Sequence, residues 1–273
     1  MKIINGRKIS NKILFDLEKE IKEKKTKPCL AIILIGNDPA SQIYVRLKEK
    51  TAQKIGIKIK KYFLSDQTLE KEILDIIKSL NKDNQVNGIL VQFPLPKHIS
   101  SEKIIQAINP EKDVDGFLLK SKFDPPFIMA IWQAIKETKE DLKDKKTIAL
   151  VNSDIFGRAL VNFLKKKRVK VEYVILRAKP EESLTDSSLA LRMTKDADIL
   201  ITAIGHSYFI NGSMIKKGAI LIDGGISKKN GKIVGDIDIE SVKEKAKWIT
   251  STPGGLGPIT IALLLKNVVL VSK

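Results

Sequence analysis

Short apolar runs that alternate with amphipathic segments are the feature that most constrains how this chain can fold. Early in the sequence, PCLAIILIG, IKIKKYFLS and VNGILVQFPLP predict strands at residues 28–36, 57–65 and 86–96. The segments at 41–56 and 68–81 carry apolar residues at helical spacing. A further helix is predicted at 100–109. Short buried strands separated by helices predict a parallel sheet with right-handed crossovers.

A second alternating block follows a Pro-containing connector and a helix at 127–138. Its predicted strands and helices fall at 146–151, 171–176, 198–204 and 219–225, and near 157–167, 187–196 and 212–216. The fold class is therefore α/β with two domains and a cleft between them. We expect a first domain at 1–118, completed by an apolar C-terminal helix at 258–272 that packs back on it. We expect a Rossmann-like second domain at 140–248.

The formal charge of +17 raises the question of nucleic-acid binding. Of the 49 basic residues only six are arginine, the residue that nucleic-acid readers use for bidentate contacts. The lysines are scattered along helices beside acidic residues, which favours a lysine-rich composition over a specific nucleic-acid site. Such a surface would still attract an anionic small molecule.

Cysteine content and hydropathy bear on the compartment. Cys29 is the only cysteine, so no intramolecular disulfide can form and a cysteine-based zinc site is disfavoured. The N-terminus lacks the apolar run of a signal peptide, and no stretch reaches the ~18 apolar residues of a membrane span. We expect a cytoplasmic protein without a membrane partner. His98 and His206 have no neighbours that suggest a metal site or a catalytic triad.

The first unusual motif is SQIYVRLKEK at 41–50. Tyr44 and Lys48 are four residues apart, so they share one face of a helix. A ring for stacking then lies beside an amine whose pKa burial can lower. An amphipathic helix with a solvated lysine is the alternative, and the pair alone favours that alternative.

The second motif combines GILVQFPLP at 88–96 with KDVDGF at 112–117. Gln92 ends a strand, at the edge where α/β sheets bind ligands. Asp115 lies in an Asp-Gly turn that could direct its carboxylate toward that edge. Simple turn chemistry is the alternative for Asp115.

The third motif is STPGGLGPIT at 251–260, which leads directly into the C-terminal apolar helix. Glycines before a helix N-terminus allow a backbone to approach a ligand closely. A plain hinge between domains is the alternative.

Together and in this order, these motifs resemble those of the bifunctional methylenetetrahydrofolate dehydrogenase/cyclohydrolase (FolD) family. The matching segments are NDPASQIYVRLK, GILVQFPLP, EKDVDGF, GAILIDGGI, VGDIDIE and STPGGLGPIT. They extend from near the N-terminus almost to the last residue. The resemblance implies an enzyme of one-carbon metabolism, which feeds purine biosynthesis. It would oxidise 5,10-methylenetetrahydrofolate with NADP, or with NAD, and hydrolyse the methenyl product to 10-formyltetrahydrofolate.

The resemblance also implies roles for individual residues. Lys48 would be the general acid/base of ring opening, held in position by Gln92. Tyr44 would stack on the folate, Asp115 would bind the pterin ring and Ser41 would line the site. Further folate contacts are implied at Pro253, Gly254 and Gly255, and cofactor contacts at Ser153, Gly157 and Ile226. No metal is implied, and a homodimer formed through the cofactor domain is expected.

Three segments depart from the family's pattern. In the loop that reads G-x-S-x-x-V-G-x-P in the family, the first glycine is Val151 and the proline is Ala159. Because valine resists positive φ and Asp154 adds negative charge, we expect weakened cofactor binding. Asn152 tolerates the left-handed region and could restore part of the turn.

The second departure is at 125–130, where PPFIMA replaces P-C-T-P-x-G. The third follows the strand at 171–176, where Arg177 or Lys179 could meet a ribose phosphate. Two rival functions stay open: a monofunctional cyclohydrolase with a decayed cofactor site, and a basic binding protein that lost the reaction.

Overall fold

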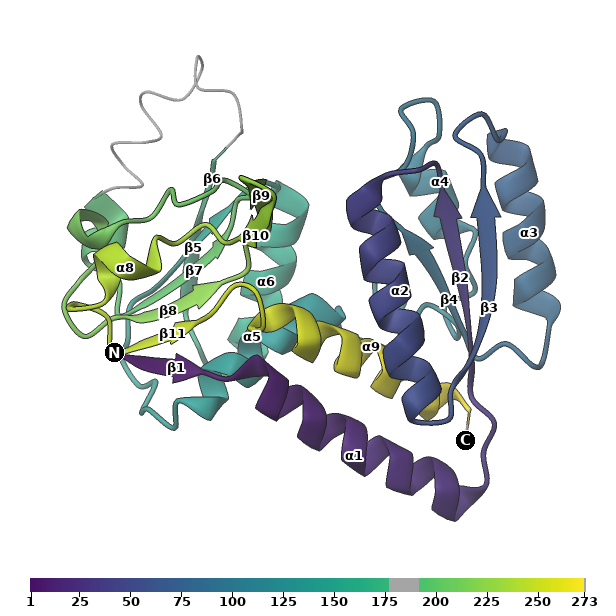
Figure 1. Cartoon of the computed structure of the whole chain (residues 1–273), viewed down its shortest axis with the longest axis horizontal. Coiled ribbons are helices and arrows are strands. Elements are labelled where there is room, and N and C mark those ends of the chain that lie inside the picture. The colour runs from purple at the N-terminus through teal and green to yellow at the C-terminus, as the bar shows by residue number, and fades with distance from the viewer. Residues whose placement is uncertain (177–191, 273) are drawn as a thin grey trace. The chain divides into compact units, whose positions relative to one another are not determined.

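The computed structural model describes residues 1–176 and 192–272 and divides into two compact units (Figure 1). Unit 1 comprises Met1–Ile9 and Phe127–Thr260, and unit 2 comprises Ser10–Pro126 and Ile261–Lys273. The candidate phosphate-binding residues Arg177 and Lys179 lie outside the described residues.

Unit 2 is built on a three-stranded parallel sheet in the order β3-β2-β4. The strands are β2 (Cys29–Ile35), β3 (Lys58–Leu64) and β4 (Gly88–Gln92). Every residue of the central strand β2 is buried, as expected for an apolar run in a parallel sheet. The helices associated with this unit are α1 (Gly6–Lys24), α2 (Pro39–Lys54), α3 (Glu70–Lys82) and α4 (Ser101–Gln106).

Local sequence determines where α2 begins. Asp38 is its N-cap, with an Oδ2 that accepts a hydrogen bond from the Ser41 amide at 2.7 Å. Pro39 follows at the first helical position, where its missing N–H costs nothing. The helix α2 thus begins at Pro39, two residues before Ser41.

The C-terminal helix α9 (Leu256–Val271) contributes residues to the core of unit 2. Its last turns carry Ile261, Leu265 and Val268, which belong to the same buried cluster as Leu17 of α1. Asn267 is also buried, and its Nδ2 donates to the Val114 carbonyl at 2.9 Å. The chain therefore returns to its first block at its end.

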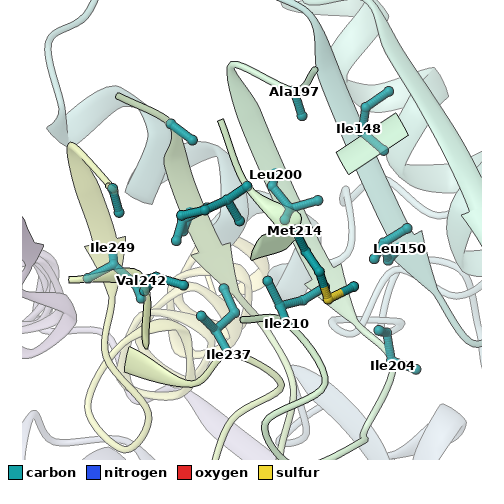
Figure 2. Packing of buried hydrophobic residues seen from close by; sticks show 14 of the residues in the cluster. Ile148, Leu150, Ala197, Leu200, Ile204, Ile210, Met214, Ile237, Val242 and Ile249 are labelled. Atoms are coloured by element: carbon teal, nitrogen blue, oxygen red, sulfur yellow. The ribbon is translucent and has the colours of Figure 1, made fainter. Parts of the chain in front are cut away.

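Within residues 1–176 and 192–272, unit 1 contains a six-stranded sheet in the order β1-β11-β8-β7-β5-β6, and each of its pairings is parallel. The strands are β1 (Lys2–Ile4), β5 (Thr147–Val151), β6 (Val171–Ile175), β7 (Ile199–Ala203), β8 (Ile220–Asp223) and β11 (Trp248–Thr250). The helices of unit 1 whose bounds are described include α5 (Pro126–Glu137), α6 (Asp154–Lys166), η2 (Gly212–Met214) and α8 (Ile239–Val242), and β9 (Ser227–Lys229) pairs with β10 (Lys232–Val234) in a hairpin. Figure 2 shows apolar side chains that pack against this sheet, among them Leu200, Met214 and Ile249.

The N-terminal residues lie in a different unit from the one that the sequence pattern suggested. Residues 1–9, assigned above to the first domain, group with unit 1. The physical reason is strand pairing, since Ile3 of β1 is in parallel register with Ile249 of β11. Three residues are too short a run to reveal such a long-range pairing in the sequence. Among residues 1–176 and 192–272, no helix is long and apolar enough to cross a membrane.

Candidate functional site

A lysine–glutamine pair lies at the carboxyl end of the unit 2 sheet. Gln92 is the last residue of β4, and Lys48 is on the third turn of α2. Lys48 Nζ donates to Gln92 Oε1 at 2.8 Å, and Gln92 Nε2 donates to the Phe93 carbonyl at 2.7 Å. Because the amide NH₂ is engaged by a carbonyl, the amide oxygen is oriented toward the amine.

The surroundings of Lys48 change its acidity. Burial lowers the pKa of the Lys48 amine, while the negative charge of Asp115 acts in the opposite direction. A lowered pKa makes the neutral, proton-accepting form of the amine accessible nearer to neutrality. Lys48 is therefore suited to accept and return a proton.

Asp115 is the acidic partner of this amine. The pKa of Asp115 is raised to about 6, chiefly by burial; the positive charge of Lys48 lowers it and the negative charge of Asp113 raises it, and both effects are included in that value. Asp115 therefore titrates within the range in which many enzymes work. A carboxyl group poised in this way can accept or donate hydrogen bonds to a polar ring edge.

The turn that carries Asp115 is held by Asp113. The buried Asp113 carboxylate accepts hydrogen bonds from the amides of Gly116 at 3.1 Å and Leu118 at 2.9 Å. Gly116 has a φ of 69°, and a Cβ there would lie 2.6 Å from the Phe123 carbonyl oxygen. The two aspartates of this motif thus differ in role, because Asp113 builds the turn and leaves Asp115 available.

Ser41 and Tyr44 come from the same helix as Lys48. Ser41 is 3% exposed, and its Oγ donates to the Phe93 carbonyl at 3.2 Å. Tyr44 is partly buried one turn before Lys48, and burial raises the pKa of its hydroxyl. The five residues singled out in this part of the chain all belong to unit 2, and the Phe93 carbonyl accepts hydrogen bonds from two of them, Ser41 and Gln92.

At the carboxyl edge of the unit 1 sheet, β5 leads into α6. Ser153 is the N-cap of α6, and its side chain makes no capping hydrogen bond. A Cβ at Gly157 would lie 2.4 Å from the Tyr173 ring of β6, so the helix can approach the sheet only with glycine here. This arrangement presents the N-terminus of α6 at the sheet edge, which suits a phosphate group.

Two buried carboxylates organise the ends of β7 and β8. The Asp236 carboxylate accepts from three successive amides: Ile204 at 2.8 Å, Gly205 at 3.0 Å and His206 at 2.8 Å. The Asp223 carboxylate accepts from the amides of Gly225 at 3.0 Å, Asp236 at 3.1 Å and Ile237 at 3.2 Å. Burial raises the pKa of Asp223 to about 7 and also raises the pKa of Asp236.

Glycines make room for these carboxylates. A Cβ at Gly225 would lie 2.0 Å from Asp236 Cγ, and one at Gly235 would lie 1.9 Å from Asp223 Oδ2. Ile226 follows this network and is 44% exposed at the end of β8. An apolar side chain is thus presented to solvent beside the two carboxylate networks.

The loop of Pro253, Gly254 and Gly255 lies in unit 1 and leads into α9. Gly254 has a φ of 100°, which favours glycine. A Cβ at Gly6 would lie 1.8 Å from the Gly255 carbonyl oxygen, so α1 begins against this loop. No group of three or more His, Cys, Asp or Glu residues that could hold a metal occurs in the described ranges 1–176 and 192–272.

Two models of one protein family match successive parts of the chain. The family model for the tetrahydrofolate dehydrogenase/cyclohydrolase catalytic domain matches residues 4–115, and the model for the NAD(P)-binding domain of the same family matches residues 125–273. The chain belongs to the tetrahydrofolate dehydrogenase/cyclohydrolase (FolD) family. The bifunctional protein FolD of Campylobacter hominis is 41% identical over 288 residues, which cover 100% of this chain and 98% of that protein.

Solved structures of FolD proteins share the architecture. FolD from Campylobacter jejuni superposes with a TM-score of 0.89 at 36% identity, covering 100% of this chain and 98% of that one. The Trypanosoma brucei FolD, complexed with NADP cofactor and an inhibitor, gives 0.89 at 28% identity, covering 98% and 96%. The two-domain α/β fold with a Rossmann-type sheet is thereby confirmed.

The FolD chain's altered loop does not adopt the strained geometry expected from its sequence. Val151 is the last residue of β5, pairs with Ile175 and Ala203, and is 0% exposed. Neither Val151 nor Asn152 has a positive φ. The expectation that valine would resist the turn is wrong, because the strand continues through position 151 and its side chain points into the core.

Asp154 is also less disruptive than its charge suggested. Its Oδ1 accepts from the Tyr173 hydroxyl at 2.7 Å, and its Oδ2 lies 2.8 Å from Arg158 Nε. These hydrogen bonds hold the pKa of Asp154 below its usual range. The negative charge is therefore paired within the first turn of α6.

Sequence reasoning in this FolD chain missed the supporting residues. The motif KDVDGF contained Asp113, but only its buried hydrogen bonds distinguish it from Asp115. Asp223 and Asp236 stood in the motifs GAILIDGGI and VGDIDIE, where the glycines beside them were the available signal. Phe93 and Phe117 make an edge-to-face ring contact at 5.8 Å beside Gln92 and the Asp115 turn, which no local pattern announced.

Proposed function

We propose that this FolD-family chain oxidises 5,10-methylenetetrahydrofolate to 5,10-methenyltetrahydrofolate with NADP, and with NAD as a possible substitute, and hydrolyses the product to 10-formyltetrahydrofolate. Both reactions belong to one-carbon metabolism, upstream of purine biosynthesis. The observation that carries the proposal is the Lys48–Gln92 hydrogen bond, next to an Asp115 whose pKa burial raises. This hydrogen bond holds in position an amine whose lowered pKa gives access to both its neutral and its protonated form.

Ring opening uses Lys48 as its proton carrier. The neutral amine accepts a proton from the water that attacks the methenyl carbon, forming a C–O bond. Breakdown then moves a proton to the ring nitrogen as its bond to that carbon breaks, leaving the formyl group on the other nitrogen. One proton is released overall. Gln92 keeps the amine in position through the 2.8 Å hydrogen bond.

The remaining residues bind and orient the folate. Asp115 hydrogen-bonds the pterin edge, Tyr44 stacks on the folate and Ser41 lines the site. Support comes from their common membership in unit 2 and from the partial burial of Tyr44 and Asp115. Pro253, Gly254 and Gly255 contribute backbone contacts to the same substrate.

The cofactor is held on unit 1 by Ser153, Gly157 and Ile226. The close approach at Gly157 and the capping position of Ser153 fit a dinucleotide phosphate at the start of α6. A bound nicotinamide cofactor would supply the acceptor for the hydride that leaves the folate. The protein's contribution to that step is orientation of the two rings, so no additional catalytic acid is needed.

A monofunctional cyclohydrolase is the weaker alternative. The departure at Val151 favoured it, and the unstrained strand at that position weakens that argument. The NAD(P)-binding domain also matches over residues 125–273.

Absorbance of the methenyl intermediate tests the function. Purified protein is given methylenetetrahydrofolate with NADP, with NAD or with neither, and separately given methenyltetrahydrofolate alone. The proposal expects cofactor-dependent oxidation and cofactor-independent loss of methenyl absorbance. Hydrolysis without oxidation under either cofactor would establish the monofunctional alternative, and neither activity would contradict the proposal.

The protein is further proposed to act as a cytoplasmic homodimer formed through unit 1. Within the described residues β6 is the last strand of its sheet, beside a groove lined by Val161, Val171, Tyr173 and Met193 among others. The single cysteine is buried, in keeping with a reducing compartment. Analytical ultracentrifugation should give twice the 30.5 kDa chain mass. Specific nucleic-acid binding is not part of this proposal.

A further inference from the structure

We propose that Phe127 and Phe156 form an aromatic surface that binds the nicotinamide ring of the cofactor. The inference rests on the proposed function, because it requires unit 1 to bind a dinucleotide. It assigns the two rings to one half of that dinucleotide, and it names two residues outside the Ser153, Gly157 and Ile226 set.

The two rings come from segments far apart in the sequence. Phe127 is in the first turn of α5, and Phe156 is in the first turn of α6. Their ring centroids are 5.5 Å apart with an interplanar angle of 33°, and both side chains remain partly exposed. The segments 125–130 and 151–159, noted above as separate departures from the family pattern, thus meet ring to ring.

A glycine places this pair at the ligand-binding edge of the sheet. A Cβ on Gly224, just beyond β8, would lie 2.7 Å from Phe127 Cζ and 2.8 Å from the Thr202 carbonyl of β7. The tip of the Phe127 ring therefore rests on the backbone where β7 and β8 end. Phe156 extends the surface to the N-terminus of α6.

Sheet topology selects which half of the cofactor meets these rings. The sheet order changes direction at β5, with β6 on one side and β7 and β8 on the other. A dinucleotide binds across such a switch point, with its pyrophosphate at the helix that follows the first strand and its adenosine ribose at the end of the second. That assigns the adenosine to β6 and the nicotinamide to the ends of β7 and β8, where Phe127 lies.

The chemistry of the rings suits this assignment. An oxidised nicotinamide is a flat cation, and aromatic faces attract both flat rings and positive charge. The reduced ring is neutral and gains only the stacking part. The surface should therefore favour the oxidised cofactor over the reduced one.

Plain packing of α5 against α6 is the competing explanation, and ligands that differ only in the nicotinamide ring separate the two. NADP and 2′-phospho-ADP-ribose are titrated separately into the whole protein by calorimetry, and their affinities are compared. NAD and ADP-ribose form a second pair that is compared in the same way. Phe156→Leu keeps an apolar side chain and removes the ring, and Phe127→Leu does the same on the other helix. Ile155→Ala, one residue away at an 83% exposed position, is the matched control.

We expect each Phe→Leu variant to bind the oxidised dinucleotide about three- to ten-fold more weakly. Binding of the ligand without nicotinamide should stay unchanged, and the loss should be smaller for NADPH than for NADP. The control should match the parent for every ligand. An equal loss for both members of a ligand pair, or no loss for either, would overturn the aromatic surface.

The parent protein supplies the remaining distinction. A parent that binds neither dinucleotide contradicts the proposed dehydrogenase function itself. A parent that binds NADP, with Phe→Leu variants that bind it equally well, contradicts only this inference. Thermal unfolding of the unliganded variants reports separately any loss of packing.

Discussion

Lys48 shows how a common residue type becomes distinctive through its surroundings. The chain has 49 basic residues, most of them lysines spread along helices, and the spacing of Tyr44 and Lys48 alone favoured a solvated surface pair. Two features set Lys48 apart: the amide oxygen of Gln92 at 2.8 Å and burial that lowers the pKa of the amine. The hydrogen-bond partner Gln92 comes from β4, so the sequence of α2 alone does not reveal it.

Replacing Lys48 tests its role in proton transfer. Lys48→Met retains much of the side-chain length and removes the amine, so ring opening should slow by roughly 10²- to 10⁴-fold. Folate affinity should change little. The rate is followed by the loss of methenyl absorbance, with Lys50→Met, an exposed lysine of the same helix, as the control. Parent-like hydrolysis by Lys48→Met would remove Lys48 from the mechanism.

Asp115 should make folate binding depend on pH. With a pKa raised to about 6, its carboxylate is ionised above that pH and protonated below it. If the ionised form accepts hydrogen bonds from the pterin, folate affinity falls as the pH drops through about 6. Asp115→Ala should weaken binding by about 1.5–3 kcal/mol at pH 8 and abolish this pH dependence. Calorimetric titrations between pH 5 and 8 decide, and an unchanged affinity would exclude the contact.

At the scale of elements, the start of α6 is governed by its contact with β6. Gly157 faces the Tyr173 ring, and the Tyr173 hydroxyl in turn donates to Asp154 at 2.7 Å. One strand residue therefore limits how closely the helix approaches and also holds its first turn. The glycine was predicted from the loop motif, whereas Tyr173 was not, because a contact between a helix and the next strand leaves no local pattern.

Gly157→Ala tests this contact. Its Cβ would lie 2.4 Å from the Tyr173 ring, so we expect a loss of about 1–3 kcal/mol in unfolding free energy and weaker cofactor binding. The Tyr173→Ala background is the control, since the cost of the added methyl should largely vanish there. Equal costs in both backgrounds, measured by urea unfolding, would show that Tyr173 is not the obstacle.

Val151→Gly should harm the protein and leave cofactor affinity no better. The valine is 0% exposed in a strand paired on both sides, so its loss removes buried apolar surface and adds backbone freedom, at a cost of about 2–4 kcal/mol. Thermal unfolding and cofactor titration give the two readouts. A gain in cofactor affinity would restore the view that this loop needs a glycine.

Much of the fold was predictable because short strands and amphipathic helices are local patterns. The buried strand β2 and the return of α9 to the first block followed from such patterns. Pairings across long distances were not predictable: the sequence does not reveal that β1 joins β11, or that Phe127 meets Phe156. In the proposed folate site, motif positions indicated Lys48, but only the folded contacts give its hydrogen bond and the direction of its pKa shift.

The pH dependence of the stability of the whole protein combines carboxyl groups whose pKa values are shifted in opposite directions. Burial raises the pKa of Asp223 to about 7, whereas the hydrogen bond and charge of Lys216 lower the pKa of the Asp198 carboxyl, which lies 2.6 Å from Lys216 Nζ. A raised folded-state pKa means that the folded protein binds the proton more tightly than the unfolded chain. The Asp223 contribution is therefore complete below about pH 4 and is lost as the pH rises toward 7.

Asp223→Asn should remove this dependence. Relative to the parent, the variant should lose stability at pH 4–5 and recover progressively by pH 8, a difference on the order of 1–3 kcal/mol. Asp198→Asn is the control of opposite sign, because its stabilising contribution grows as the pH rises. Unfolding by urea across this pH range gives both curves. Parallel curves for the parent and Asp223→Asn would show that Asp223 does not titrate in this way.

The interleaving of the two units along the chain has a consequence for how the protein is made. Strand β1 (Lys2–Ile4) pairs with β11 (Trp248–Thr250), so the sheet of unit 1 cannot be completed until translation has passed residue 250. The core of unit 2 is completed later still, because its residues Ile261, Leu265 and Val268 follow β11 in the sequence. Neither half can therefore complete its folding on the ribosome while the other is still being made. Removal of residues 261–271 would therefore leave unit 2 without part of its apolar core.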